Sequence, residues 1–206
     1  MKTTITEGNA RITIDKASVV TKKLEAFYNP KMRLHRDFSI LLLQSIPGKG
    51  KKVLLPLAGT GVRGIRLLQE VEDIREVILN DCNPKAVAYM KENLEQNALS
   101  QDKRIRIEEK DANLLLCELE TGFDYIDIDP YGSPNFLLEN ALRRLKSGGV
   151  LALTATDTGA LAGTYVNACK AKYWACSARC PQQHEMGLRI LARKVILQGM
   201  HQDKAL

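Results

Sequence analysis

The amino-acid sequence predicts an α/β fold built on a doubly wound, mostly parallel sheet. Five short apolar or alternating segments have the length of β-strands, and helical segments separate most of them. No internal repeat and no linker interrupts this order. At 206 residues the chain has room for one sizeable domain. We therefore expect a single domain over 1–206, with an N-terminal extension at 1–48 and the core at 49–206.

The N-terminal extension combines strand, turn and helix signals. Residues 3–20, which include Val19 and Val20, alternate polar and β-branched side chains around a Gly-Asn pair, a pattern typical of a hairpin. A turn is expected at 27–30. The apolar stretch 37–45 predicts a helix that ends before Pro47.

The core alternates strand and helix signals. The expected strands occupy 52–57, 76–81, 105–110, 125–129 and 149–156. The expected helices occupy 65–70, 85–97, 134–146 and 185–197. Between the fifth strand and the last helix the pattern loosens, and it predicts no further element.

Composition and charge limit the class of protein. The chain is 45% hydrophobic and 26% charged, and no run of eighteen apolar residues is present, which excludes a membrane-spanning segment. The first residues lack the apolar segment of a secretory signal, so we expect a cytoplasmic protein with reduced cysteines. The net charge of +6 favours a polyanionic partner such as nucleic acid only modestly, because solvated helix faces also carry basic clusters. One such cluster is Lys170, Lys172, Arg179, Arg189, Arg193 and Lys194.

A glycine-rich loop, AGTGVRG at 58–64, follows the first core strand. Ligands of open α/β sheets bind at the carboxyl ends of the strands. Gly59 and Gly61 let the backbone approach a ligand closely and leave helix amides free, so we predict that they bind a cofactor. The spacing of Gly59, Gly61 and Gly64 also fits a dinucleotide fingerprint, although helix–strand packing alone can require glycine.

Acidic residues follow the next two strands. Asp81 is placed to bind a ribose diol, and the carboxylate of Asp111, before Ala112, is placed to accept from an adenine amino group. Each acid taken alone is also a common helix N-cap. Two acids and a glycine loop at consecutive strand ends favour a nucleoside-bearing cofactor, either NAD or S-adenosylmethionine.

The segment DIDPYGSP at 127–134 favours the methyl donor. An amino group conjugated to a base ring is a poor nucleophile, and a carboxylate such as Asp129 can accept its hydrogen bonds and its proton. Tyr131 offers a face for stacking of a base, and Pro130 stiffens the turn. Asp127 shares the strand face of Asp129 and is expected to be a supporting acid.

Five ordered motifs then resemble one family, the tRNA (guanine-26-N2)-dimethyltransferases. They are FYNPKM with Arg36-Asp37, LAGTGVRGIR, Asn80-Asp81, DIDPYGSP with TATD after it, and HEMGLRIL. The resemblance implies a Rossmann-like class I methyltransferase fold, S-adenosylmethionine as cofactor, and N2 of a tRNA guanine as acceptor. It implies Asp129 as the catalytic carboxylate, with Tyr131 beside it. The cofactor-binding positions that it implies are Arg36, Arg63, Asp81, Asp111 and Ala112.

The sequence departs from the family pattern at three points. Tyr131 stands where the family usually has phenylalanine, and His35 stands where it has asparagine. The region after Gly163 differs from the pattern. Because family members continue for more than a hundred residues beyond this length, we expect the last antiparallel edge strands and the C-terminal domain to be absent.

Several alternatives remain open. Cys176, Cys180 and His184 have helical spacing, but tetrahedral zinc sites usually use paired cysteines on turns, so we expect no metal. Asp157 is either a strand-end ligand or a helix cap.

The alternative functions are a non-catalytic S-adenosylmethionine- or RNA-binding remnant, and an N-methyltransferase that acts on another amine.

Overall fold

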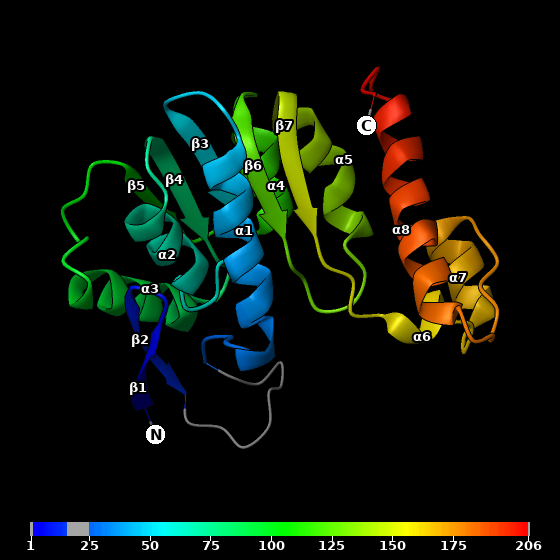
Figure 1. The fold of residues 1–206 in the computed structure, drawn as a ribbon, viewed down its shortest axis with the longest axis horizontal. Helices are drawn as coiled ribbons and strands as arrows, with labels where there is room; N and C mark the ends of the chain where they lie inside the picture. Colours follow the sequence, from blue (N-terminus) through cyan, green and yellow to red (C-terminus); the bar gives the residue numbers. More distant parts are fainter. Residues whose placement is uncertain (1, 16–24, 206) are drawn as a thin grey trace. The chain divides into compact units, whose positions relative to one another are not determined.

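A computed structural model describes residues 2–15 and 25–205 of the chain (Figure 1). The described chain divides into two compact units. The first unit comprises Met1–Asp127 and Leu145–Ala152, and the second comprises Ile128–Arg144 and Leu153–Leu206. The expected organisation as a single methyltransferase domain stays a prediction.

The N-terminal hairpin is confirmed within the described residues. Strands β1 (Lys2–Glu7) and β2 (Ala10–Asp15) pair antiparallel in a register that sets Glu7 opposite Ala10. Val19 and Val20 of the predicted hairpin lie outside the described residues. The hairpin packs against helices α2 (Val62–Glu70) and α3 (Pro84–Gln96), so it is part of the first unit.

The central sheet has five strands in the order β5-β4-β3-β6-β7. The pairs β3–β4, β3–β6 and β4–β5 are parallel, which confirms the predicted fold class. The strands are β3 (Lys51–Leu55), β4 (Ile74–Asn80), β5 (Ile105–Glu108), β6 (Phe123–Ile128) and β7 (Leu145–Leu153). In the described chain, β5 and β7 form the two edges of this sheet.

The helices follow the predicted order with different bounds. They are η1 (Pro30–Met32), α1 (Arg33–Ser45), α2 (Val62–Glu70), α3 (Pro84–Gln96), α4 (Ala112–Glu118), α5 (Asn135–Arg144), α6 (Thr158–Leu161), α7 (Val166–Tyr173) and α8 (Gln183–Met200). The sequence pattern missed α4, α6 and α7, each of which has eight residues or fewer and too few turns to show a helical period. None of the helices in the described residues is both long and apolar enough to cross a membrane.

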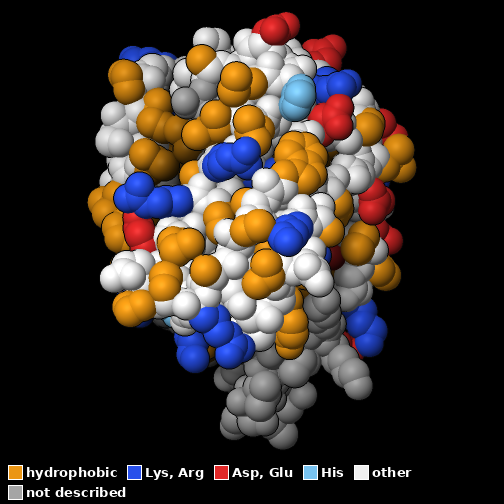
Figure 2. All heavy atoms as spheres, turned by 90° about the vertical axis from the view of Figure 1, so that its right-hand side faces the viewer, with side chains coloured by type: hydrophobic (Ala, Val, Ile, Leu, Met, Phe, Trp, Pro, Cys, Tyr) orange, Lys and Arg blue, Asp and Glu red, His pale blue; other side chains and the backbone are white. Residues whose placement is uncertain are grey.

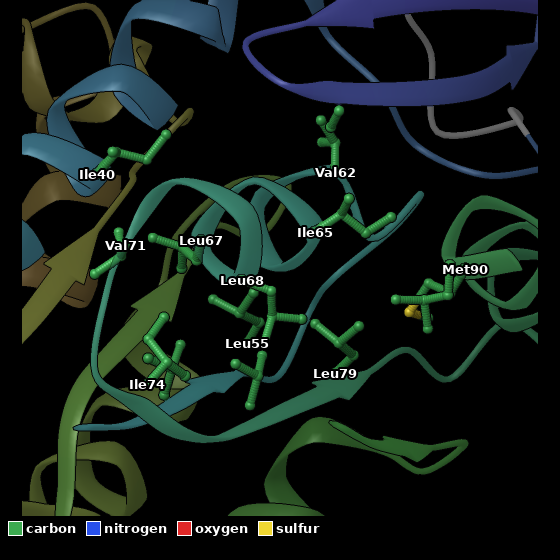
Figure 3. Packing of buried hydrophobic residues seen from close by; sticks show 14 of the residues in the cluster. Ile40, Leu55, Val62, Ile65, Leu67, Leu68, Val71, Ile74, Leu79 and Met90 are labelled. Atoms are coloured by element: carbon green, nitrogen blue, oxygen red, sulfur yellow. The ribbon is translucent and has the colours of Figure 1, made fainter. Parts of the chain in front are cut away.

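The core of the first unit lies between the sheet and α2 (Figure 3). Ile65 and Leu67 of α2, Leu79 of β4 and Met90 of α3 are completely buried there. The burial of these side chains supplies the main favourable free energy for fixing the loop that precedes α2.

Gly64 lies where α2 is in close contact with side chains of the sheet. A Cβ atom at this position would lie 2.4 Å from Leu79 Cδ2 and 3.3 Å from Leu55 Cδ1. We expect Gly64→Ala to lower the free energy of unfolding by about 1–3 kcal/mol, measured by urea denaturation, because the core would be overpacked. The same substitution in a Leu79→Ala background should cost less, since space is available there. An equal cost in both backgrounds would contradict this explanation.

The second unit has its own apolar cluster. Its members come from α6, α7 and α8, and they are Ala160, Leu161, Cys169, Tyr173, Ile190 and Leu191. The three helices contact one another, and α5 contacts α8. The second unit therefore holds α7 and the segment before α8 in defined positions.

Candidate functional site

The glycine-rich loop begins where β3 ends. The Ala58 amide donates to Asn80 O at 2.7 Å, and the Gly59 amide donates to Asp81 Oδ2 at 3.1 Å. Gly59 has a φ of +55°, and a Cβ atom there would lie 2.7 Å from Phe27 O. Only glycine fits this backbone without strain. Gly61 is the N-cap residue of α2, so both predicted glycines lie in the turn that leads into the helix.

Asn80 and Asp81 join the ends of three strands. The Asn80 side chain is buried; its Nδ2 donates to Pro56 O at 2.9 Å and to Lys110 O at 3.0 Å, and its Oδ1 accepts from the Lys110 amide. Asp81 accepts from the Gly59 amide and from the Asn83 amide. Burial raises the pKa of Asp81, and these backbone donors oppose that effect. Asn80 thus fixes the strand ends, and Asp81 ties the loop to β4.

Asp111 acts as a helix cap in the structure. Its Oδ1 accepts from the amides of Asn113 and Leu114 at 2.9 and 3.1 Å, and buried Ala112 is the first residue of α4. The capping alternative is therefore realised. A carboxylate has about four acceptor positions, so capping leaves room for a further hydrogen bond.

Arg36 is buried in α1 and bound by a carboxylate of the hairpin. Its Nε donates to Glu7 Oε1 and its Nη2 to Glu7 Oε2, both at 2.6 Å. Glu7 is 1% exposed and also accepts from Tyr28 Oη at 2.8 Å and from Arg66 Nη1 at 3.0 Å. Burial alone would raise the pKa of Glu7, but hydrogen bonding and charge attraction from Arg36, with Tyr28 and Arg66, lower it to about 2.

Arg63 of α2 is held by the end of β6. Its Nε lies 2.5 Å from Asp127 Oδ2, and its Nη1 donates to Ser39 Oγ at 2.5 Å. Tyr125 Oη also donates to Ser39 Oγ, at 2.9 Å. Burial and the charge of Asp127 raise the pKa of the Tyr125 phenol. Asp127 therefore contacts a predicted cofactor residue, as expected of a supporting acid.

The turn after β6 belongs to the second unit and carries Asp129 and Tyr131. Asp129 is half-buried and Tyr131 is 39% exposed. Partial burial and the nearby charge of Asp129 raise the pKa of the Tyr131 phenol. Gly132 has a φ of +88° and makes two hydrogen bonds with Thr156. The Gly132 amide donates to Thr156 Oγ1 at 2.6 Å, and the Thr156 amide donates to Gly132 O at 2.9 Å. Thr156 thereby fixes the turn.

Asp157 does not cap the helix that follows it, and its role as a strand-end ligand stays a prediction. Its side chain makes no capping hydrogen bond to α6. It accepts from Tyr173 Oη at 2.6 Å and pairs with Lys172 Nζ at 3.1 Å. Burial and the Asp157 hydrogen bond raise the pKa of the Tyr173 phenol. Asp157 thus connects the end of β7 to α7.

The cysteine and histidine residues do not form a metal site in the described chain. Cys176 and Cys180 precede α8, so they do not share a helix face with His184. The Cys180 thiol instead lies 3.4 Å from Met186 Sδ. Within the described ranges, no group of three or more His, Cys, Asp or Glu residues is arranged to hold a metal ion.

The structure thus distributes the predicted residues over the two units. The first unit contains the predicted cofactor residues, and the second contains Asp129 and Tyr131, which directly follow β6 in the chain. Sequence reasoning missed Glu7, Ser39 and the role of Thr156. A usable signal was available for Thr156, since it belongs to the TATD segment at the predicted end of a core strand.

Comparisons with known proteins point to one family. The family model described as N2,N2-dimethylguanosine tRNA methyltransferase matches residues 8–206. A tRNA (guanine(26)-N(2)/guanine(27)-N(2))-dimethyltransferase of Aquifex aeolicus is 39% identical over 98% of this chain and 53% of its own length. A tRNA (guanine(26)-N(2))-dimethyltransferase of Thermococcus kodakarensis is 43% identical over 93% of this chain and 53% of its own length.

A solved structure gives the same result. Trm1 from Pyrococcus horikoshii in complex with S-adenosyl-L-methionine superposes with a TM-score of 0.84 at 37% identity, and the match covers 95% of this chain and 54% of that one. The chain spans about half the length of the curated relatives it matches. On the extent of the family match, the chain belongs to the N2,N2-dimethylguanosine tRNA methyltransferase family.

Proposed function

We propose that this chain binds S-adenosylmethionine and transfers its methyl group to N2 of the guanine at position 26 of tRNA, in the cytoplasm. The observation that carries the proposal is the turn after β6, which places the Asp129 carboxylate near the partly exposed Tyr131 ring. Thr156 holds this turn by hydrogen bonds to Gly132. The names of the relatives and of the superposed structure support the choice of tRNA and of the cofactor.

The first unit has the groups that a nucleoside cofactor requires. Gly59 has a positive φ that favours glycine and shapes the loop after β3, and Asp81 offers carboxylate oxygens to a ribose diol. We assign Gly61, Asp111 and Ala112 to the same cofactor site. Arg36 and Arg63 are assigned to this site as its two positively charged residues. S-adenosylmethionine supplies an electrophilic methyl group on a positively charged sulfur.

Asp129 and Tyr131 act on the acceptor base. The lone pair of a guanine amino group is delocalised into the ring, so the nitrogen is a poor nucleophile. Asp129 accepts a hydrogen bond from this amino group, which localises electron density on the nitrogen, and it takes the proton that transfer releases. Tyr131 provides the face on which an extruded base stacks.

Tritium transfer from labelled S-adenosylmethionine to tRNA transcripts tests the proposal. We expect incorporation into a transcript with guanine at position 26 and at least tenfold less into the same transcript with adenine there. Binding of cofactor and tRNA without transfer would favour the non-catalytic alternative. Equal labelling of both transcripts, or labelling of another amine only, would contradict the proposed acceptor.

Asp81 provides a separate test of the cofactor site. We expect Asp81→Asn to weaken S-adenosylmethionine binding by roughly 10- to 100-fold in calorimetry, because hydrogen bonds to a charged acceptor are worth about 1.5–3 kcal/mol. Glu108→Gln, which removes an acid from the neighbouring strand β5, is the matched control and should bind normally. Unchanged affinity in Asp81→Asn would remove Asp81 from the site.

A further inference from the structure

The second unit carries a concentration of positive charge that the proposed chemistry does not use. Between residues 164 and 194 the sequence contains six lysines and arginines and one acid, Glu185. Over the whole chain the corresponding numbers are 30 and 24, so this segment is far more basic than the rest. The segment comprises α7, the loop after it and the first part of α8.

Three of these cations are exposed and have no acidic partner among the described residues. Lys172 pairs with Asp157, and Arg189 pairs with Glu185. Lys170, Arg179 and Arg193 are exposed, and no carboxylate in the described part of the chain forms an ion pair with any of them. Positive charge that has no internal partner is available to attract an anionic ligand.

Two exposed aromatic residues flank α7. Tyr165 is its N-cap residue and is 65% exposed, and Trp174 is its C-cap residue and is 50% exposed. Trp174 has a left-handed backbone with a φ of 55°, and the Lys194 ammonium lies 2.9 Å from the centre of its ring. Lys194 thus lies over the indole ring, half of whose residue surface remains exposed.

An arginine accompanies each aromatic residue. Arg179 Nη2 donates to Thr164 Oγ1 at 3.3 Å, next to Tyr165, and Arg193 Nη1 donates to Trp174 O at 3.2 Å. Both ends of α7 thus combine an exposed ring with an exposed guanidinium. Figure 2 shows the face that contains α7 and α8, where Lys and Arg side chains lie among apolar ones.

We propose that the α7 surface, defined as Tyr165, Lys170, Trp174, Arg179 and Arg193, binds RNA. Its cations contact phosphates, and its two rings stack with unpaired bases, the combination by which proteins hold single-stranded RNA segments. The identification of the RNA as tRNA rests on the proposed function. The binding itself requires only the charges and rings of this surface.

The cations are tested by binding alone, without cofactor. The triple variant Lys170→Ala, Arg179→Ala, Arg193→Ala should weaken binding of a fluorescent tRNA transcript at least tenfold, measured by anisotropy. The slope of log K against log salt concentration should become smaller in magnitude by about 2 to 3. Each lost phosphate contact removes roughly 0.7–0.9 from this slope. The control triple Arg75→Ala, Lys91→Ala, Lys103→Ala removes equal charge from exposed positions of the first unit and should change neither quantity by more than about twofold.

The aromatic contribution has its own pair of variants. Tyr165→Leu should weaken binding about tenfold, since stacking of a base contributes at this level, and Tyr165→Phe should bind like the original protein. Circular dichroism and thermal melts establish that all variants are folded. If the α7 triple variant binds tRNA with unchanged affinity and salt slope while methyl transfer is intact, the surface is refuted and the proposed function stands. If the original protein transfers no methyl group but loses RNA binding in the triple variant, the surface stands and the proposed function fails.

Discussion

Asp129→Asn is expected to lower the rate of methyl transfer to tRNA by about 10²- to 10⁴-fold, the usual contribution of a positioned acid or base. Asparagine keeps the size of the side chain and one acceptor oxygen, but it removes the negative charge and the ability to take a proton. The turn itself should persist, because the two hydrogen bonds between Gly132 and Thr156 are retained in the variant. Cofactor affinity should therefore be unchanged.

Single-turnover tritium transfer and calorimetric titration of S-adenosylmethionine separate these two effects. Asp127→Asn is the matched control, since it removes an equal charge two residues earlier in the chain. Asp127 binds Arg63, so its loss should reduce cofactor affinity more than the rate at saturating cofactor. Tyr131→Phe should keep full activity, because the ring remains. Transfer within a few-fold of the original rate in Asp129→Asn would exclude this residue as the catalytic carboxylate.

The parts of the site that the sequence predicted are those encoded locally. A glycine loop after an apolar strand and an acid after the next strand imply a shared edge, because parallel strands align their carboxyl ends. The hydrogen bond from the Gly59 amide to Asp81 agrees with that geometry. The capping role of Asp111 follows from the same local pattern, an acid directly before a helix.

The parts that the sequence could not predict are contacts between distant segments. Glu7 lies in a hairpin whose alternating pattern marks a strand but does not identify the partner of a buried acid. Arg36 is 29 positions away and belongs to a helix. Asp127 and Arg63 are likewise brought together only by the packing of α2 against the sheet. A single sequence gives the type of each residue, and the pairing depends on tertiary structure.

Segments without a period were also missed. α6 has four residues and α7 has eight, and each is held by the apolar cluster of the second unit. The two caps of α7, Tyr165 and Trp174, are not residues that favour caps, so turn chemistry gave no signal. The basic cluster was visible in the sequence, but its exposed rings became evident only with the path of the chain.

Glu7→Gln is expected to lower the free energy of unfolding by about 3 kcal/mol at neutral pH. The pKa of Glu7 is lowered to about 2 from an ordinary 4.5, and each pKa unit corresponds to about 1.4 kcal/mol. The destabilisation arises mainly at Arg36. Arg66 keeps its ion pairs with Glu70 and Asp37, whereas Arg36 has no second carboxylate in the described residues. Removing one partner leaves a buried guanidinium uncompensated.

The pH dependence identifies the cause. A lowered carboxyl pKa stabilises the folded state fully above about pH 4.5, and this contribution disappears as the pH falls toward 2. The difference in unfolding free energy between the original protein and Glu7→Gln, measured by urea denaturation, should therefore shrink below pH 4.5. Glu76→Gln, which removes an acid from a partly exposed pair with Lys52, should cost less than about 1 kcal/mol. A Glu7→Gln variant as stable as Glu76→Gln, or a difference that does not change with pH, would show that Arg36 does not depend on this carboxylate.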